Sequence, residues 1–161
     1  MLLAIDPGLE GTGWAVFRHS TPVKCGIETA SRRYKWFEKL HYYCEFMERL
    51  AVKVRATECV LERPVFMQSS GGMVTAKSDS LVKLAMLVGA LYTRMPPLVK
   101  RCTLVTPNQW KGQLPKTIAI DRIQMRLDSR TLTALEPSDP EASATHDWDA
   151  LGIGLNHLGK F

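Results

Sequence analysis

The sequence predicts an α/β fold in which helices cover a sheet of mixed strand direction. Three short apolar runs near its start, separated by tight turns, are typical of an antiparallel meander. A long amphipathic segment then leads to a fourth apolar run, which indicates a helical crossover to a strand parallel to the first. With 161 residues, of which 45% are hydrophobic and 23% charged, the chain is expected to form one domain over residues 1–161.

The three strands of the meander are expected over residues 2–5, 13–18 and 23–29. The first is an unbroken apolar run that ends at Asp6, directly before Pro7-Gly8. Glycines between the first two runs indicate a hairpin. Because α/β proteins place functional groups at the carboxyl ends of such strands, Asp6 is a candidate site residue.

The middle of the chain is expected to alternate between helix and strand. Residues 34–55 repeat apolar side chains at three- and four-residue steps, which predicts an amphipathic helix that covers the sheet. The run 58–62 predicts a central strand that ends in a second carboxylate, Glu62. A glycine- and serine-rich loop over residues 68–72 then precedes a helix expected over residues 77–94.

The last third of the chain carries one more strand and two more helices in this interpretation. The strand is expected over residues 102–106 and the first helix over residues 116–127. Residues 129–144, rich in proline and acidic side chains, are expected to form a surface loop. The final helix is expected to begin with Thr145 as its N-cap and to run through Leu158.

The net charge of +5 and the isoelectric point of about 9.1 suit a polyanionic partner, although the chain lacks the dense basic blocks of a purely electrostatic DNA binder. No apolar stretch is long enough to span a bilayer, and no cleavable signal is recognisable. We therefore expect a soluble protein of the cytoplasm with no membrane partner. The four cysteines are scattered singly, which favours reduced thiols over disulfides or metal ligands.

Two potential metal ligands leave the start of the final helix together. His146 and Asp149 are three residues apart, so both project from one face of its first turn. If that end packs beside the ends of the strands that carry Asp6 and Glu62, four ligands converge on one small volume. Packed carboxylates repel one another unless a cation or a proton separates them, which favours a divalent metal site.

Ligands of this kind, with open positions between them, suit hydrated Mg²⁺ or Mn²⁺ and the hydrolysis of a phosphodiester. A purely structural role is an alternative for each of these residues when it is considered alone. Asp6 can be a turn residue, Glu62 an ion-pair partner of Arg63, and His146 a helix cap. Asp147 projects about 100° away from His146 around the helix and is expected to have a structural or outer-sphere role.

These residues resemble the motifs of RuvC-type Holliday junction resolvases, in order and over nearly the whole chain. The compact length and divergent middle are more similar to the phage-encoded branch than to the cellular enzymes. The matching segments are Asp6-Pro-Gly with Thr12-Gly13-Trp14-Ala15-Val16, Glu62 with Val65-Phe66-Met67, and His146-x-x-Asp149-Ala150-Leu151.

The resemblance implies an RNase H-like fold with a five-stranded mixed sheet, and a homodimer that nicks opposing strands of a four-way junction. We expect two Mg²⁺ or Mn²⁺ ions at each site and nicks that carry a 5′-phosphate and a 3′-hydroxyl. The implied metal ligands are Asp6, Glu62, His146 and Asp149, and the implied catalytic set adds Lys111 and Lys116 at the scissile phosphate.

The resemblance also places Phe66 near the aromatic residue that resolvases use to disturb stacking at the junction centre. Pro64 departs from the family pattern here, and a packing role for Phe66 is an equal alternative. Other side chains that could line the DNA are Gln68, Ser69, Ser70 and Lys77. Lys111 and Lys116 have a simpler reading too, as solvated surface lysines, and Trp110 is expected to pack its loop.

Three other functions are alternatives to junction resolution. One is another RNase H-like nuclease that acts on structured RNA or on replication intermediates, and Thr12 departs from the basic residue that the ribosomal-RNA-processing relatives carry there. Another is a non-catalytic junction-binding module, which the intact carboxylates disfavour. An actin-like ATPase requires two such domains, so the chain is too short for it and no nucleotide cofactor is expected.

Overall fold

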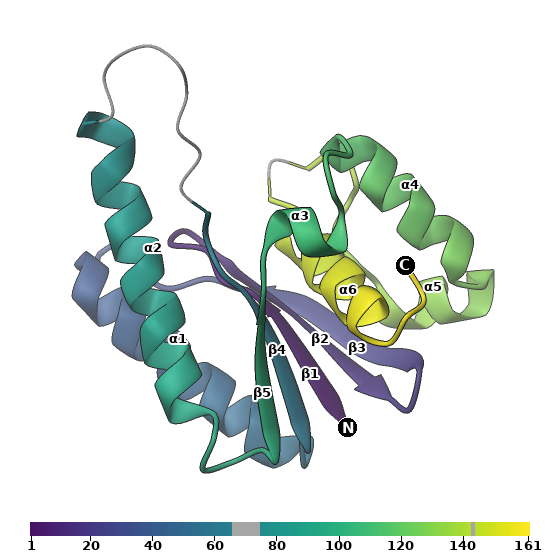
Figure 1. Cartoon of the computed structure of the whole chain (residues 1–161), viewed down its shortest axis with the longest axis horizontal. Helices are drawn as coiled ribbons and strands as arrows, with labels where there is room; N and C mark the ends of the chain where they lie inside the picture. Colours follow the sequence, from purple (N-terminus) through teal and green to yellow (C-terminus); the bar gives the residue numbers. More distant parts are fainter. Residues whose placement is uncertain (66–74, 143) are drawn as a thin grey trace.

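The computed structural model describes residues 1–65, 75–142 and 144–161, with residues 75–78 as backbone only (Figure 1). Five strands form one sheet in the order β3-β2-β1-β4-β5. Strands β1, β2 and β3 are antiparallel neighbours, whereas β4 lies parallel to β1 and β5 parallel to β4. The α/β prediction with a mixed sheet is therefore confirmed. The strands are β1 Leu2–Asp6, β2 Thr12–Arg18, β3 Thr21–Glu28, β4 Glu58–Glu62 and β5 Arg101–Val105.

Helices cover both faces of the sheet (Figure 1). The crossover helix α1, Trp36–Lys53, and the long helix α2, Thr75–Arg94, pack on one face. The other face carries α6, His146–His157, with α4, Lys116–Arg126, beside it. None of the helices in the described parts of the chain is long and apolar enough to cross a membrane.

Strand β1 supplies the centre of both cores because its side chains alternate between the two faces. Leu3 and Ile5 pack into the core under α1 and α2, while Leu2 and Ala4 pack into the core under α6. All five residues of β1 are buried. Such burial on both faces explains why the strand is a continuous apolar run instead of an alternating one.

One expected loop is partly helical. The sequence predicts a surface loop over residues 129–144, but Ser129–Leu135 form helix α5. Asp128 caps this helix, because its Oδ1 accepts a hydrogen bond from the backbone N–H of Thr131 at 2.7 Å. Leu135 is buried and anchors the helix in the core beneath α6. The prediction was wrong because the acidic and proline residues further along masked this short capped segment.

Helix α6 is buried along most of its length, from Asp147 to Leu155. Two of its glycines permit close contacts: a Cβ on Gly152 would lie 2.4 Å from Trp110, and one on Gly154 would lie 2.1 Å from Phe17. Thr145 occupies the N-cap position as expected, although its side chain makes no capping hydrogen bond. Helix α6 thus lies flat against the sheet and places its first turn at the carboxyl end of β1.

Candidate metal centre

Three of the predicted ligands meet at the end of β1. Each of Asp6, His146 and Asp149 offers a ligand atom, and these atoms all lie within 4.8 Å of one another. Gly13, the partner of Asp6 across the hairpin, makes this approach possible. A Cβ on Gly13 would lie 2.0 Å from the backbone oxygen of His146, so only glycine lets α6 begin this close to the sheet.

Asp6 is buried, with 6% of its surface exposed, and its carboxylate contacts His146 directly. The Nδ1 atom of His146 lies 2.6 Å from Oδ2 of Asp6. Burial raises the pKa of Asp6 above its ordinary value, although the hydrogen bond from His146 opposes this shift. The same hydrogen bond raises the pKa of His146. A proton is therefore held between the two groups when no metal replaces it.

Asp149 is also buried, with 7% of its surface exposed, and it faces two lysines. Nζ of Lys116 lies 2.6 Å from Oδ2 of Asp149, and Nζ of Lys111 lies 3.8 Å from Oδ1. Lys116 begins α4, whereas Lys111 follows the short helix α3, Pro107–Trp110. The structure thus brings both sequence-predicted lysines to the carboxylate cluster.

Glu62 lies beside the cluster of Asp6, His146 and Asp149 but is not part of it. It ends β4, the strand next to β1, and its Oε2 accepts a hydrogen bond from Nε1 of Trp110. Burial raises the pKa of Glu62 to about 7, and the neighbouring charge of Asp6 adds to this shift. In the described chain Glu62 forms no ion pair with Arg63, so the surface-pair alternative for Glu62 is not observed.

The donor set fits a divalent cation of the Mg²⁺ or Mn²⁺ type. Carboxylate oxygens are the ligands that such cations prefer, and one imidazole nitrogen is compatible with Mn²⁺. The raised pKa values of Asp6 and Glu62 reflect carboxylates that are costly to bury as anions in the metal-free protein. A bound cation would remove that cost and take the place of the proton between Asp6 and His146.

We expect the Glu62→Gln variant to stabilise the metal-free protein. The folded-state pKa of Glu62, about 7, exceeds its ordinary value of 4.5. This carboxyl therefore favours folding most at low pH, and the contribution is lost as pH rises through 7. In EDTA at pH 8 the variant should melt at a higher temperature, with a gain of up to about 3 kcal/mol in the free energy of unfolding.

The gain should vanish near pH 4, where Glu62 is protonated in both folded and unfolded wild type. Thermal melts in EDTA across this pH range measure the effect. Glu141→Gln, an exposed carboxyl far along the loop before α6, is the matched control and should show no gain. A lower melting temperature for Glu62→Gln at pH 8 would contradict the assigned cost of burying this anion.

The sequence predicts a structural or outer-sphere role for Asp147 and DNA contacts for residues that follow β4. Asp147 is turned away from the carboxylate cluster, and its two carboxylate oxygens accept hydrogen bonds from the backbone N–H and the hydroxyl of Ser138, each at 2.6 Å. Asp147 thus holds the preceding loop against α6. The predicted DNA contacts Phe66, Gln68, Ser69 and Ser70 lie outside the described residues. Lys77 lies in α2, outside the residues whose side chains are described.

Trp110 has a second role that sequence reasoning missed. The expected packing role is confirmed, because the indole is buried with only 2% of its surface exposed. Its N–H, however, reaches Glu62, which lies 48 positions earlier in the chain. The only sequence signal for a place of Trp110 near the site was its position directly before Lys111, a predicted site residue.

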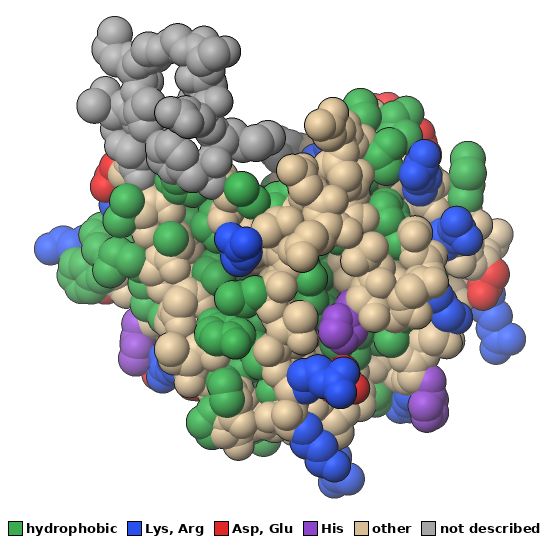
Figure 2. Space-filling model, viewed as in Figure 1, with side chains coloured by type: hydrophobic (Ala, Val, Ile, Leu, Met, Phe, Trp, Pro, Cys, Tyr) green, Lys and Arg blue, Asp and Glu red, His purple; other side chains and the backbone are tan. Residues whose placement is uncertain are grey.

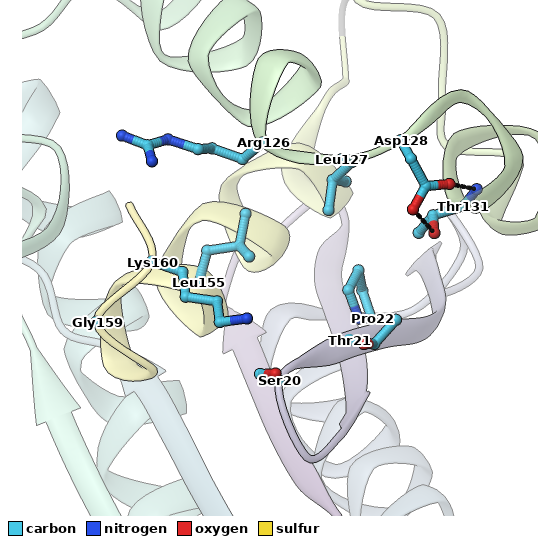
Figure 3. A pocket seen from close by; sticks show the side chains of 10 residues that line it. All are labelled: Ser20, Thr21, Pro22, Arg126, Leu127, Asp128, Thr131, Leu155, Gly159 and Lys160. Carbon is cyan, nitrogen blue, oxygen red and sulfur yellow. Dashed lines mark hydrogen bonds between the residues drawn. The ribbon is translucent and has the colours of Figure 1, made fainter.

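A pocket of about 480 Å³ lies at the opposite end of the sheet (Figure 3). It lies between the turn after β2, with Ser20, and the end of α4, with Arg126. Strand β2 starts beside Asp6 and runs away from it, and Lys160 follows the far end of α6. This pocket is therefore separate from the carboxylate cluster.

No protein-family model matches the chain, and no curated protein matches it in sequence. The fold is nevertheless similar to that of several solved structures. RuvC of T. thermophilus in complex with a Holliday junction substrate superposes with a TM-score of 0.66 at 17% identity, covering 97% of this chain and 90% of that chain.

Two further structures show the same likeness. The Fowlpox virus resolvase, solved with Holliday junction DNA, has a TM-score of 0.57 at 12% identity and covers 100% of both chains. The yeast mitochondrial Holliday junction resolvase Ydc2 has a TM-score of 0.57 at 13% identity, covering 98% of this chain and 77% of that chain. The predicted RNase H-like fold, with its five-stranded mixed sheet flanked by helices, is thereby confirmed.

Proposed function

We propose that the chain, as one RNase H-like nuclease domain over residues 1–161, is a metal-dependent endodeoxyribonuclease that resolves four-way and other branched DNA junctions. The observation that carries this proposal is the meeting of Asp6, His146 and Asp149 at the end of the central strand. The fold shared with junction resolvases and the net charge of +5 support a DNA substrate.

Two Mg²⁺ or Mn²⁺ ions, held by Asp6, Glu62, His146 and Asp149, would activate a water and stabilise the leaving 3′ oxygen, so that cleavage yields 5′-phosphate and 3′-hydroxyl ends. Two lysines would bind the phosphate that is cleaved. Lys116 and Lys111 reach Asp149 in the metal-free protein. With Asp149 serving as a metal ligand, both ammonium groups would be free to bind the scissile phosphate.

Paired nicks on opposing strands require two sites, and we propose that α2 joins two copies of the chain. One face of α2 exposes apolar side chains: Val82 is 56% exposed and Met86 48% exposed. Gly89 follows on the same face, and a Cβ added there would meet nothing within 4 Å. Figure 2 shows hydrophobic side chains gathered over this helix, to the left of the view. Two such faces can pack closely against each other.

A charge on this face should separate the copies. We expect Met86→Glu to weaken dimerisation at least about 30-fold, because burying an unpaired carboxylate costs more than about 2 kcal/mol. Sedimentation measures the equilibrium. Met125→Glu makes the same change at a residue of α4 that is 84% exposed, and it should leave the dimer intact. A monomeric wild type, or a Met86→Glu variant that dimerises normally, would count against α2 as the interface.

A contact with the junction centre is proposed for Phe66, and contacts elsewhere along the DNA for Gln68, Ser69, Ser70 and Lys77, on the sequence alone. The divergent middle of the chain supports an assignment to the phage-encoded branch of the resolvases. The protein would then act in the cytoplasm of the bacterial host.

The decisive experiment presents the purified protein with a labelled four-way junction, a linear duplex and an RNA/DNA hybrid, each with and without Mn²⁺. Symmetric nicks on the junction alone, dependent on Mn²⁺ and ligatable, are the expected result. Preferential cleavage of the hybrid would instead assign the site to another class of RNase H-like nuclease. Junction binding without any cleavage would indicate a non-catalytic binding module.

A further inference from the structure

We propose that Trp110 is a positioning residue that holds the Glu62 carboxylate in place for metal binding. The inference rests on the proposed function, because it takes Glu62 to be a ligand of the cations. It adds a residue that no motif of the chain marks as functional. The buried indole makes four contacts that together fix its position.

The first contact joins Trp110 to Glu62. The indole N–H donates a hydrogen bond to Oε2 of Glu62, and Trp110 has only 2% of its surface exposed. A buried N–H needs an acceptor, and a hydrogen bond to a charged acceptor is stronger than one to a neutral group. Within the described chain, no other side chain donates a hydrogen bond to this carboxylate.

Two further contacts fix the ring of Trp110. Gly152 of α6 leaves the space that the indole fills, since a Cβ there would lie 2.4 Å from Cζ3. On another side the ring meets Phe161 edge to face, with 5.6 Å between the ring centres. Such packing leaves the indole no freedom to turn its N–H away from Glu62.

The short helix that carries Trp110 is itself fixed. Thr106 caps it, since its hydroxyl accepts a hydrogen bond from the backbone N–H of Gln109 at 3.3 Å. The side chain of Gln109 accepts one in return from the backbone N–H of Thr106 at 2.8 Å. This reciprocal capping box aims Trp110 from the end of β5 towards the neighbouring strand β4.

The fourth contact links the indole to Lys111. Nζ of Lys111 lies 4.8 Å from the centre of the Trp110 ring and 3.8 Å from Oδ1 of Asp149. The edge of one indole therefore meets Glu62 while its face supports the ammonium group of Lys111. Trp110 consequently contacts both the carboxylate of Glu62 and the ammonium group of Lys111.

Loss of this donor should weaken metal binding. Hydrogen bonds that orient metal ligands contribute about 10- to 100-fold to metal affinity. We expect the Trp110→Phe variant, which keeps an aromatic ring and removes the N–H, to bind Mn²⁺ about tenfold more weakly. Calorimetric titration of Mn²⁺ alone into the DNA-free protein measures this affinity without reference to cleavage.

A pair of glycine variants separates positioning from stability. Gly152→Ala crowds the indole, so it should also weaken Mn²⁺ binding about tenfold. Gly154→Ala creates a clash at least as severe in the same helix, but with Phe17, and should leave the Mn²⁺ affinity unchanged. Equal losses in both variants would show a general effect of overpacking and would overturn the inference.

A measurement that leaves Trp110 unchanged covers the case in which the Trp110→Phe variant fails to fold. The chain has four tryptophans, so labelling with ¹⁵N gives four indole N–H signals. One signal should shift both when Mg²⁺ is added and when Glu62 is changed to Gln. Absence of such a signal, or a Trp110→Phe variant that is folded and binds Mn²⁺ like the wild type, would overturn the role of Trp110.

The two proposals fail differently. If the wild type binds neither Mn²⁺ nor Mg²⁺, the metal centre itself is wrong. If the wild type binds Mn²⁺ and the Trp110→Phe variant binds it equally well, the metal centre stands and only the positioning role is wrong.

Discussion

The Asp6→Asn variant should lose cleavage of a four-way junction by at least about 10³-fold, equivalent to about 4 kcal/mol of transition-state stabilisation. Asp6 ends the central strand, and its ligand oxygen lies within 4.8 Å of those of both His146 and Asp149. An amide in its place removes the negative charge that a cation at the centre of the cluster requires.

The same variant should still fold and still bind the junction. Burial raises the pKa of Asp6, so a neutral side chain at this position removes a cost of folding. The amide oxygen can still accept the hydrogen bond from His146. DNA affinity depends mainly on phosphate contacts, and we expect it to stay within about twofold of the wild type.

Single-turnover cleavage of a labelled junction, together with binding by fluorescence anisotropy in EDTA, separates the two effects. Asp121→Asn, at an exposed position of α4, is the matched control and should cleave normally. Undiminished cleavage by Asp6→Asn would refute the proposed metal centre. Loss of cleavage together with a loss of binding would assign Asp6 to DNA recognition or to folding instead of metal binding.

The second large effect concerns His146 and has two parts, the preference for metal and the dependence on pH. Imidazole is a softer ligand than carboxylate and suits Mn²⁺ better than Mg²⁺. We expect His146→Asp to lower the ratio of the Mn²⁺-supported to the Mg²⁺-supported cleavage rate by roughly threefold or more. Cleavage rates at saturating concentrations of each metal give this ratio.

The pH dependence follows from the proton shared with Asp6. The hydrogen bond to Asp6 raises the pKa of His146 above its ordinary 6.5, and His146 must lose this proton before it can bind a metal. The wild-type cleavage rate should therefore fall at low pH, and this acid limb of the pH profile should begin above pH 6.5. His146→Asp should move this limb to lower pH, although the pKa of Glu62, about 7, retains part of it.

Rate profiles between pH 5.5 and 9 at several Mn²⁺ concentrations test the shift, because protons and metal compete for the same ligands. His157→Gln is a matched control, since His157 lies at the far end of the same helix, 3.4 Å from Glu58. If His146→Asp leaves both the metal ratio and the acid limb unchanged, His146 is not a ligand.

Much of the fold could be predicted because its signals are local. The apolar run before Asp6 and the repeat at three- and four-residue steps in α1 reflect burial on the faces of single elements. Helix α5 was missed because its signal is one capping residue, Asp128, and a few apolar side chains within a polar stretch. Whether such a short segment forms a helix depends on its packing against the core.

The candidate site, too, was predictable from the sequence only in part. The spacing of His146 and Asp149 placed both on one helical face, and Asp6 and Glu62 each end a strand, so these four could be named in advance. Their meeting depends on Gly13, whose missing Cβ lets α6 approach the hairpin. No local pattern specifies that contact, because Gly13 and His146 are far apart in the chain.

The sequence by itself thus determined the order of the elements and the chemical nature of the candidate ligands, since both follow from periodicity and residue type over short windows. Only the tertiary structure decided that Lys111 and Lys116 face Asp149, that Asp147 turns to Ser138, and that the N–H of Trp110 ends on Glu62. These contacts depend on how α3, α4 and α6 pack at the end of the sheet. Close packing between distant segments, which no short window of sequence encodes, sets their geometry.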